Sequence, residues 1–299
     1  MNLDIHVKIQ DLTPPVAMLI FLNNSLVPEG EARVSVLDRG FLYGDGIFET
    51  LRAYSGAIFH CNDHLDRLFH SAEAIYLRIP FTRDYLMEAL YRTLEANHLK
   101  DAYLRLSVTR GVSEPGLDIE GCLSPTLTII AKEFSGYPEG LHQSGIRAAV
   151  VNTRRIPASA LNPAVKSLNF LNNIMARVEA KRLNAAEAIM LNMEGYVAEG
   201  TVSNIFMVKG GLIKTPPLSA GILNGVTRSI VIDLLKENGI PVIEQAFYPD
   251  ELYTADECFV TSTLYEVMPV TTINGNAVGS GKPGKLTQTI LNLFRRLTA

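Results

Sequence analysis

Residues 197–206 read VAEGTVSNIF, a stretch that follows a turn and runs into a strand of the buried type. A carboxylate at a turn, such as Glu199, is most often a solvated surface group. A carboxylate buried against a pyridine nitrogen acts differently, because it keeps that nitrogen protonated and makes the ring an electron sink. Glu199 is therefore a candidate cofactor residue, with a surface turn as the alternative.

A lysine upstream of this stretch also allows two interpretations, a surface charge or a functional group. Lys166 lies in NPAVKSLNF, between an apolar run and the start of a predicted helix. Most lysines are solvated surface charges. Where a lysine stem enters a partly desolvated pocket, burial lowers the pKa of the amine from about 10.4 toward the range in which it is a nucleophile. Lys166 is thus the candidate nucleophile.

Two further segments could hold a phosphate group. Residues 223–228, LNGVTR, form a glycine turn that opens a predicted helix. The first amides of a helix have no partner within the helix, and the helix dipole favours an anion there. Arg67, in HLDRL, could bind two oxygens of a phosphate with its guanidinium, although a helix arginine is more often solvated.

The whole chain predicts two domains of mixed secondary structure. Its 299 residues exceed what one compact core usually contains. Segment 135–144 is polar and contains several Gly and Pro residues, which predicts a linker between a first domain over 1–134 and a second over 145–299. Strands and helices are mixed without strict alternation, so the predicted fold class is α+β.

Periodicity and turn residues predict the individual elements. Ser55 and Gly56 indicate a hairpin, and Asn62 is the predicted cap of a helix that Pro80 ends. Further helices are expected at 82–97, near 171–183, up to 238 and from 285. Short strands joined by turns are expected over 18–59, with alternation through 47–54. Further strands are expected near 102–109, 126–131, 146–151, 188–191, 204–208, 242–247 and 258–261.

Composition argues against several other classes of protein. The net charge of -4 and the pI near 5.9 give no broad electrostatic reason to bind a nucleic acid. The first fifteen residues contain no basic region before an apolar run, and no window reaches the roughly 18 apolar residues of a membrane span. Three scattered cysteines without CxxC spacing suit a reducing compartment. We therefore expect a cytoplasmic protein.

Two other kinds of site are weighed and set aside. A cluster of possible metal ligands comprises His60, Cys61, Asp63, His64 and His70. A helix capped by Asn62 would leave His60 in the preceding strand, off the helical face of His64, so we expect no metal. Residues 44–46, GDG, lack the third glycine of a dinucleotide-binding fingerprint.

Seven segments in a fixed order together resemble the class IV aminotransferases, which share fold type IV of the enzymes that use pyridoxal 5'-phosphate (PLP). They read YGDGIFETLR, HLDRL, YLRLSVTRG, KSLN, EGYVAEGTVSN, LNGVTR and FVTSTLYEVMPV, and the resemblance covers about residues 21–297. It implies a small α/β N-terminal domain, a larger C-terminal domain with a pseudo-barrel sheet, PLP held between them, and a homodimer.

The resemblance also implies roles for the matching residues. Lys166 matches the Schiff-base lysine that also carries the proton, and Glu199 matches the carboxylate that faces the pyridine nitrogen. Leu223 would pack on the ring face, and Tyr196 would hydrogen-bond the ring hydroxyl. The implied phosphate contacts are Arg67, Val226, Thr227 and Thr263.

The residues of the implied substrate pocket look most like those of branched-chain aminotransferases. They are Tyr43, Phe48, Tyr103, Arg105 and Ser262. An apolar aromatic pocket would take the substrate side chain, while the tyrosines and the arginine orient the carboxylate. Bacillus-type D-amino-acid aminotransferases carry an Arg-x-His pair in the loop after TRG, where this chain reads GVSEPGLDIEG.

Other members of the family remain open as alternatives. Asn224 stands where the branched-chain pattern commonly has Pro, and the segments FVTSTLYEV and KSLN also resemble the D-amino-acid enzymes. D-amino-acid aminotransferases and aminodeoxychorismate lyases are therefore the alternatives within the family. A binding protein that keeps the fold without catalysis is the alternative from another class.

The resemblance finally implies a reaction. It is ping-pong transamination between a branched-chain L-amino acid and 2-oxoglutarate. We also expect the loop over 111–124 to cover the site, and in a dimer its tip could come from the partner subunit.

Overall fold

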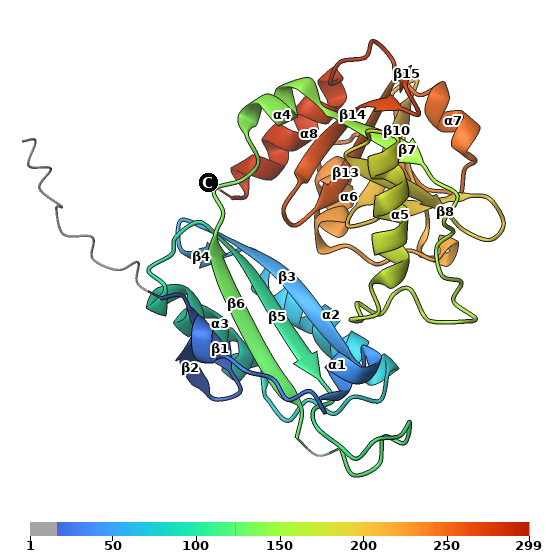
Figure 1. Cartoon of the computed structure of the whole chain (residues 1–299). Coiled ribbons are helices and arrows are strands. Elements are labelled where there is room, and N and C mark those ends of the chain that lie inside the picture. Colours follow the sequence, from blue (N-terminus) through green and yellow to red (C-terminus); the bar gives the residue numbers. More distant parts are fainter. Residues whose placement is uncertain (1–16, 123, 299) are drawn as a thin grey trace, which may run out of the picture.

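A computed structural model describes residues 17–122 and 124–298 (Figure 1). Its framework is two β-sheets that lie next to each other. One has six strands taken from residues 19–133, and the other has nine strands taken from residues 146–277. The first fifteen residues, from which we expect no targeting signal, lie outside the described residues.

The first sheet is antiparallel throughout, in the order β2-β1-β6-β5-β3-β4. Its strands are β1 Leu19–Leu22, β2 Ser25–Pro28, β3 Gly46–Tyr54, β4 Ala57–Ile58, β5 Ala102–Thr109 and β6 Thr126–Glu133. The β3–β4 turn consists of Ser55 and Gly56, which both have positive φ, as the predicted hairpin requires. Side chains of β5 alternate between buried and half-buried, so one face of the sheet meets a core.

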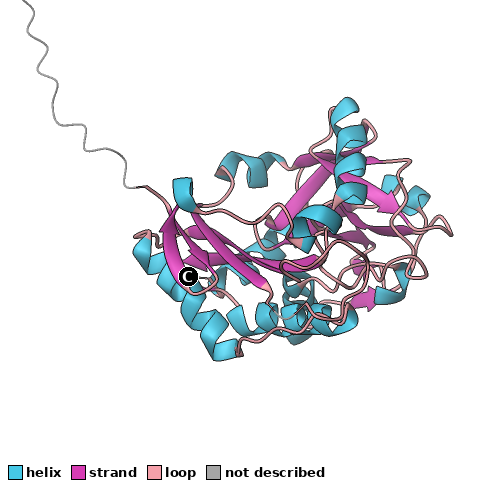
Figure 2. Ribbon diagram, turned by 60° about the horizontal axis from the view of Figure 1, so that its bottom comes forward, coloured by secondary structure: helices cyan, strands magenta, loops and turns pink. Residues whose placement is uncertain are grey.

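Helices α2 (Cys61–Ala74) and α3 (Arg83–Ala96) pack on that face of the first sheet, as Figure 2 shows. Helix α3 lies within the predicted range 82–97, and Thr82 caps it, since its side chain accepts a hydrogen bond from the Tyr85 amide. The predicted cap of α2 is wrong. The helix begins at Cys61, after His60 in the left-handed conformation, so Asn62 lies inside the first turn. Two short helices, η1 (Glu29–Glu31) and α1 (Arg39–Tyr43), precede β3.

The second sheet follows the order β12-β11-β10-β13-β14-β7-β8-β9, with β15 paired to β14. Its strands are β7 Ile146–Val150, β8 Glu187–Leu191, β9 Val197–Gly200, β10 Asn204–Lys209, β11 Leu212–Thr215, β12 Val242–Glu244, β13 Glu257–Ser262, β14 Glu266–Ile273 and β15 Asn276–Ala277. Strand β9 also contacts β10, so the sheet curls back on itself. This curl is the pseudo-barrel that the resemblance implies.

Six helical segments accompany the second sheet. They are α4 Glu139–Ser144, α5 Leu171–Arg182, η2 Leu218–Ala220, α6 Val226–Glu237, α7 Pro249–Tyr253 and α8 Lys285–Arg296. Helices α6 and α8 pack on each other and on β13 around a core of large apolar side chains. The segment 135–144, expected as a linker, contains α4, which packs on β14.

Strand β14 is the longest element that the sequence did not predict. It is almost wholly buried, so it shows no polar–apolar alternation, and Pro269 interrupts its sequence. The proline is tolerated in a central strand because pairing with β7 begins only at Val270. Among residues 17–122 and 124–298, no helix has both the length and the apolar character needed to cross a bilayer.

Candidate active site

A cavity of about 320 Å³ lies between the two sheets. Side chains from β3 and β5 form one wall, while the other wall comes from β9, β13 and the start of α6. Eleven of the predicted site residues line it: Phe48, Arg67, Tyr103, Arg105, Lys166, Glu199, Leu223, Val226, Thr227, Ser262 and Thr263. Residues that are far apart in the sequence therefore meet in one place.

Lys166 reaches this cavity from a loop that is fastened to β3. The Phe48 amide donates to the Lys166 carbonyl at 3.0 Å, and the Lys166 amide donates to Ser71 Oγ on α2 at 3.2 Å. The Lys166 Nζ lies 4.6 Å from the centroid of the Phe48 ring. Burial, reinforced by the nearby Arg67 cation, lowers the pKa of the Lys166 amine to about 8.

Glu199 is a buried carboxylate with fixed orientation on the opposite wall. Its Oε1 accepts from Arg155 Nε at 2.7 Å, and its Oε2 accepts from the Leu223 amide at 2.9 Å and from Asn204 Nδ2 at 3.3 Å. Burial raises the pKa of Glu199, while Arg155 opposes that shift. The surface-turn alternative for Glu199 is excluded, because the side chain is only 4% exposed.

Arg67 lies at the end of the cavity where α6 begins. Its Nη1 donates to the Asn224 carbonyl at 3.0 Å, and its Nε and Nη2 donate to the two oxygens of Glu49. Glu49 is fully buried, and its Oε2 lies 2.8 Å from His64 Nδ1. Although burial favours the neutral acid, the charge and hydrogen bonds of Arg67 lower the pKa of Glu49 to about 2. Burial lowers the pKa of His64.

The start of α6 is shaped to receive an anion. No side chain caps this helix, so its first amides are not satisfied by a capping group. A Cβ on Gly225 would lie 2.0 Å from Asn204 Oδ1, which explains why glycine occupies the turn. Thr261 Oγ1, on the adjacent wall, is buried without a hydrogen-bond partner among the described residues. An anion with several oxygens matches this set of donors.

The part of the cavity beside β3 and β5 is mostly aromatic. The Phe48 and Phe170 rings meet edge to face at 5.5 Å, and the guanidinium of Arg105 lies 3.8 Å from the Phe48 ring centroid. Tyr103 lines the same wall. An apolar surface with one cation at its edge suits a small molecule that has both an apolar group and a carboxylate.

The sequence model of a family described as amino-transferase class IV matches residues 46–273. The chain belongs to the class IV aminotransferases. This family uses PLP, and the α+β fold with a curled second sheet is fold type IV, as predicted.

Relatives of this class IV aminotransferase have two different names. A protein from Methanocaldococcus jannaschii, provisionally named a branched-chain-amino-acid aminotransferase, is 46% identical and covers 93% of this chain and 96% of its own length. A D-alanine aminotransferase from Bacillus licheniformis is 38% identical and covers 91% of this chain and 94% of its own length.

Solved structures show the same fold. The branched-chain aminotransferase from Thermoproteus uzoniensis with norvaline has a TM-score of 0.89 and 40% identity, and covers 95% of both chains. The branched-chain amino acid aminotransferase from Thermobaculum terrenum, in its PLP-form, has a TM-score of 0.84 and 28% identity over 94% of both chains.

Two of the expected site residues do not line the cavity of this class IV aminotransferase. Tyr196 stacks on Tyr248 with ring centroids 4.4 Å apart. It comes directly before β9, the strand that carries Glu199. Tyr196 is not among the residues that line the cavity, and its contact with the ring hydroxyl stays a prediction.

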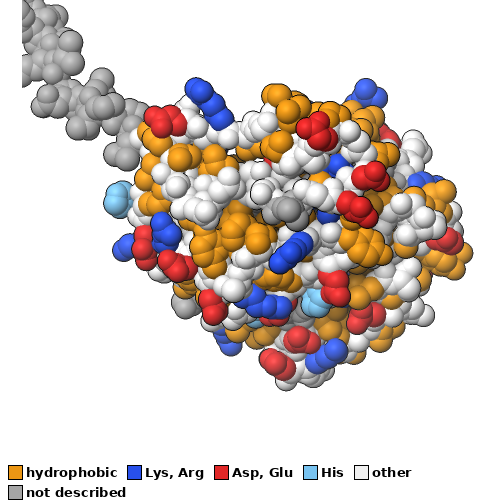
Figure 3. All heavy atoms as spheres, turned by 90° about the horizontal axis from the view of Figure 1, so that it is seen from below, with side chains coloured by type: hydrophobic (Ala, Val, Ile, Leu, Met, Phe, Trp, Pro, Cys, Tyr) orange, Lys and Arg blue, Asp and Glu red, His pale blue; other side chains and the backbone are white. Residues whose placement is uncertain are grey.

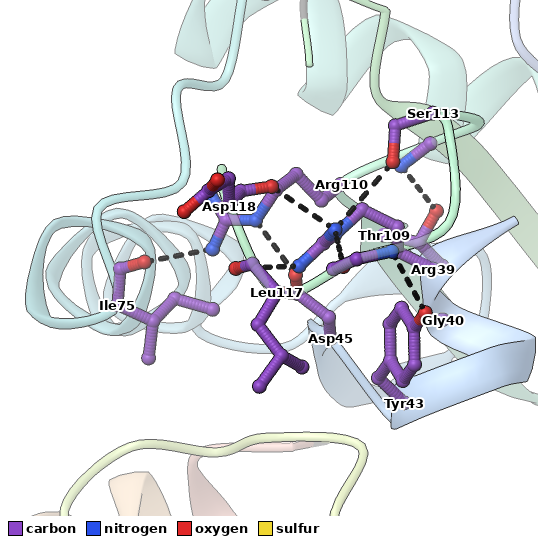
Figure 4. Close-up of polar contacts among 12 residues, drawn as sticks. Arg39, Gly40, Tyr43, Asp45, Ile75, Thr109, Arg110, Ser113, Leu117 and Asp118 are labelled. Carbon is purple, nitrogen blue, oxygen red and sulfur yellow. Dashed lines mark hydrogen bonds and ion pairs between the residues drawn. The ribbon is translucent and has the colours of Figure 1, made fainter. Parts of the chain in front are cut away.

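Tyr43 instead supports the loop that follows β5 (Figure 4). Its hydroxyl accepts from the Gly116 amide at 3.2 Å. The Arg39 guanidinium donates to the carbonyls of Gly116, Leu117 and Asp118, so the loop folds around Arg39 rather than over the cavity. None of residues 111–122 lines the cavity, and the expectation that this loop covers the site of its own chain is wrong.

Several residues of the site were not identified from the sequence. Glu49 and Arg155 orient Arg67 and Glu199, while Tyr137 and Tyr265 add to the cavity wall. A carboxylate inside the apolar strand GIFETLRAY could have identified Glu49 as a buried, paired group. Arg155 lies in a long loop, and its local sequence contains no comparable signal.

Two histidines of the cluster, His60 and His64, contact different carboxylates and share no partner among residues 17–122 and 124–298. His64 contacts Glu49, and His60 Nδ1 lies 2.5 Å from the exposed Asp63 carboxylate. Burial raises the pKa of the Cys61 thiol to about 11, which disfavours the thiolate that a metal would need. Within the described part of the chain, no group of three or more His, Cys, Asp or Glu side chains is arranged to hold a metal.

Proposed function

We propose that this class IV aminotransferase binds PLP in the cavity and transfers amino groups from branched-chain L-amino acids to 2-oxoglutarate. The observation that carries the proposal is a neutralisable lysine, a buried carboxylate and an anion-binding helix start around one cavity, next to an apolar aromatic wall. Each group has chemistry that suits one part of the cofactor or the substrate.

The residues present fit PLP. Arg67, the amides of Val226 and Thr227, and Thr263 would hold the phosphate, while Leu223 would pack on the ring. When bound, PLP supplies a pyridinium ring that accepts the electron pair left at the substrate Cα. Glu199 would stabilise the charge on the ring nitrogen, because Arg155 and the Leu223 amide fix its carboxylate in the cavity wall.

Lys166 would serve as the nucleophile and the proton carrier. With a pKa of about 8, roughly a tenth of the amine is neutral at pH 7, against less than a thousandth for an ordinary lysine. No hydrogen bond fixes its Nζ among the described residues, so the amine is free to take a proton from the substrate and return it nearby. The ping-pong order follows if both substrates use the same cavity in turn.

The aromatic wall supports the choice of donor. Phe48, Tyr103 and Phe170 would surround the substrate side chain, and Arg105 would meet a carboxylate. Each additional buried methylene contributes about 0.8 kcal/mol, which favours leucine, isoleucine and valine over alanine. Ser262 lines the same cavity and adds a hydroxyl to it.

A screen of L- and D-amino acids with 2-oxoglutarate tests this choice. We expect L-glutamate to form fastest from L-leucine, L-isoleucine and L-valine, more slowly from L-alanine, and not from D-alanine. The similarity to the Bacillus licheniformis D-alanine aminotransferase supports a D-amino-acid enzyme as the second candidate. Turnover of D-alanine without turnover of L-leucine would establish that alternative. Release of pyruvate and an aromatic amine from aminodeoxychorismate would instead identify a lyase.

A homodimer is part of the proposal. Exposed apolar residues gather on the segment before β3 and on the loop that folds around Arg39: Val34, Val36, Leu37, Phe41, Leu42, Val112, Leu117 and Ile119. Figure 3 shows groups of hydrophobic side chains between charged ones on the face seen from below. A patch of this kind commonly marks a protein interface, and a second copy of the chain is the proposed occupant.

The domain boundaries and the location in the cell are also proposals. Domains over 1–134 and 145–299, joined by 135–144, are supported by the separation of the two sheets, whose strands end at Glu133 and begin again at Ile146. The cytoplasm is proposed from the sequence. It is supported by the three free cysteines, two of which are buried.

A further inference from the structure

One buried carboxylate that is not among the proposed PLP or substrate contacts links a loop of the cavity wall to the first sheet. Glu266 is the first residue of β14 and is 3% exposed. Its Oε1 accepts from Arg52 Nη1 at 2.8 Å and from the Tyr54 hydroxyl at 3.1 Å, and its Oε2 accepts from Arg295 Nε at 2.9 Å. Both oxygens are therefore occupied by donors within the protein.

These donors come from different parts of the fold. Arg52 and Tyr54 belong to β3 of the first sheet, and Arg295 belongs to α8 at the end of the chain. Arg295 also pairs with Glu139 of α4, in the segment between the two sheets. A single carboxylate thus connects β3, β14 and α8, and reaches α4 through Arg295.

Arg52 is itself held on both sides. Its guanidinium lies 4.2 Å from the Tyr54 ring centroid and 5.0 Å from that of Phe134. A Cβ on Gly136 would lie 2.9 Å from Arg52 Nη2, so a larger residue there would push the arginine away. The cation has little freedom to seek another partner, which makes the contact with Glu266 a fixed point between the sheets.

The backbone of Glu266 adds a second argument. Its φ is 57°, a left-handed conformation that is unfavourable for a residue other than glycine. Ser262 pairs with Glu266 across a three-residue hairpin loop, a turn that usually has glycine at such a position. A glutamate here indicates that its side chain contributes more than the backbone conformation costs.

The hairpin loop over 263–265, which comes directly before Glu266, forms part of the cavity wall. Thr263, Leu264 and Tyr265 all line the cavity, and the Tyr265 and Tyr137 ring centroids are 5.0 Å apart. The loop therefore carries both the expected phosphate contact, Thr263, and a residue of the wall. Movement of Glu266 relative to β3 would move these side chains.

We propose that Glu266 is a positioning residue that fixes the 263–265 loop against the first sheet and thereby sets the cavity for PLP and substrate. The inference rests on the proposed function. It assigns no contact between Glu266 and cofactor or substrate; the side chain acts through the loop.

The test compares two variants with a matched control. Glu266→Gln removes the charge but keeps the size, and Glu266→Gly suits the left-handed backbone but removes the side chain. Glu257→Gln is the control, because Glu257 on β13 also binds α8, through the Leu286 and Thr287 amides, but does not line the cavity. PLP affinity of the apoenzyme, KM, kcat and the melting temperature are measured for each protein.

We expect both Glu266 variants to raise the PLP dissociation constant and the donor KM by about ten-fold, with kcat at saturation reduced much less. Glu257→Gln should lower the melting temperature while leaving PLP affinity and KM at wild-type values. Wild-type PLP affinity and KM in both Glu266 variants, with only a lower melting temperature, would reduce Glu266 to a structural role and overturn the inference.

Two further measurements keep the test decisive. If Glu266 variants do not fold, Tyr54→Phe removes one of the hydrogen bonds alone, and we expect it to raise the PLP dissociation constant by about two- to five-fold. An unchanged constant would overturn the inference in that case. Failure of the proposed function is recognised separately, because the wild-type protein would then take up no PLP at all.

Discussion

Arg67 and Glu49 form a two-point ion pair, with Nε 2.8 Å from Oε1 and Nη2 2.7 Å from Oε2. This arrangement leaves Nη1 as the nitrogen that faces the turn before α6, where it donates to the Asn224 carbonyl. The geometry fixes the plane of the guanidinium before any anion arrives. Such preorganisation strengthens binding, because the side chain loses little further freedom when PLP binds.

The first prediction concerns Glu49→Gln. The variant keeps one hydrogen-bond acceptor but loses the negative charge that orients the Arg67 guanidinium. We therefore expect the PLP dissociation constant to rise about ten-fold. Fluorescence titration of the apoenzyme measures it. Glu88→Gln, on the exposed side of α3, is the control and should bind PLP as the wild type does. Equal affinity in the two variants would show that Arg67 needs no partner.

A second prediction concerns stability in acid. The pKa of Glu49 is lowered from 4.5 to about 2 in the folded protein, so its ionised form is favoured by folding. Glu49 therefore stabilises the fold fully above pH 4.5, and this contribution is lost as the pH falls toward 2. Urea unfolding at about pH 5 and about pH 3 should show a smaller loss of stability in Glu49→Gln than in the wild type. Identical losses would contradict the prediction.

The third prediction follows from the amine of Lys166. Its pKa is lowered to about 8, and the neutral amine is the reactive form, so the rate of PLP capture by the apoenzyme should rise with pH and level off above about 8. Stopped-flow absorbance measures this rate. Borohydride should then attach PLP covalently to the wild type and to Lys100→Ala, but not to Lys166→Ala. Covalent attachment in Lys166→Ala would show that another lysine reacts.

Substitution of Arg105 gives the fourth prediction. Arg105→Met removes the cation at the edge of the aromatic wall, and loss of a charge-assisted hydrogen bond should lower kcat/KM for the amino donor by roughly ten- to a hundred-fold. PLP affinity should change little, because Arg67 and α6 lie at another part of the cavity. A large loss of PLP affinity with unchanged KM would place Arg105 on the cofactor instead.

The fifth prediction tests the proposed dimer. Phe41 is 73% exposed in one chain, and Phe41→Asp places a charge in the apolar patch. We expect light scattering after gel filtration to show a dimer for the wild type and a shift toward monomer for the variant. Tyr76→Asp, at another exposed aromatic residue, is the control and should remain dimeric. A monomeric wild type would refute the assignment.

The sequence determined much of the local structure. Local sequence patterns predicted α3 and β5 almost to the residue, since these signals depend only on neighbouring side chains. The order of the motifs around Lys166 and Glu199 was enough to indicate the family. Strand β14 was missed, because a strand buried on both faces has no alternation and Pro269 argues against a strand.

Only the tertiary structure decided which residues meet. The contacts of Glu49 with Arg67, of Arg155 with Glu199 and of Glu266 with Arg52 join segments that are far apart in the chain. The stacking of Tyr196 on Tyr248, outside the cavity lining, likewise joins two segments that are far apart in the chain. Local sequence sets the preferences of each element, whereas burial and charge pairing between elements become defined only when the two sheets pack together.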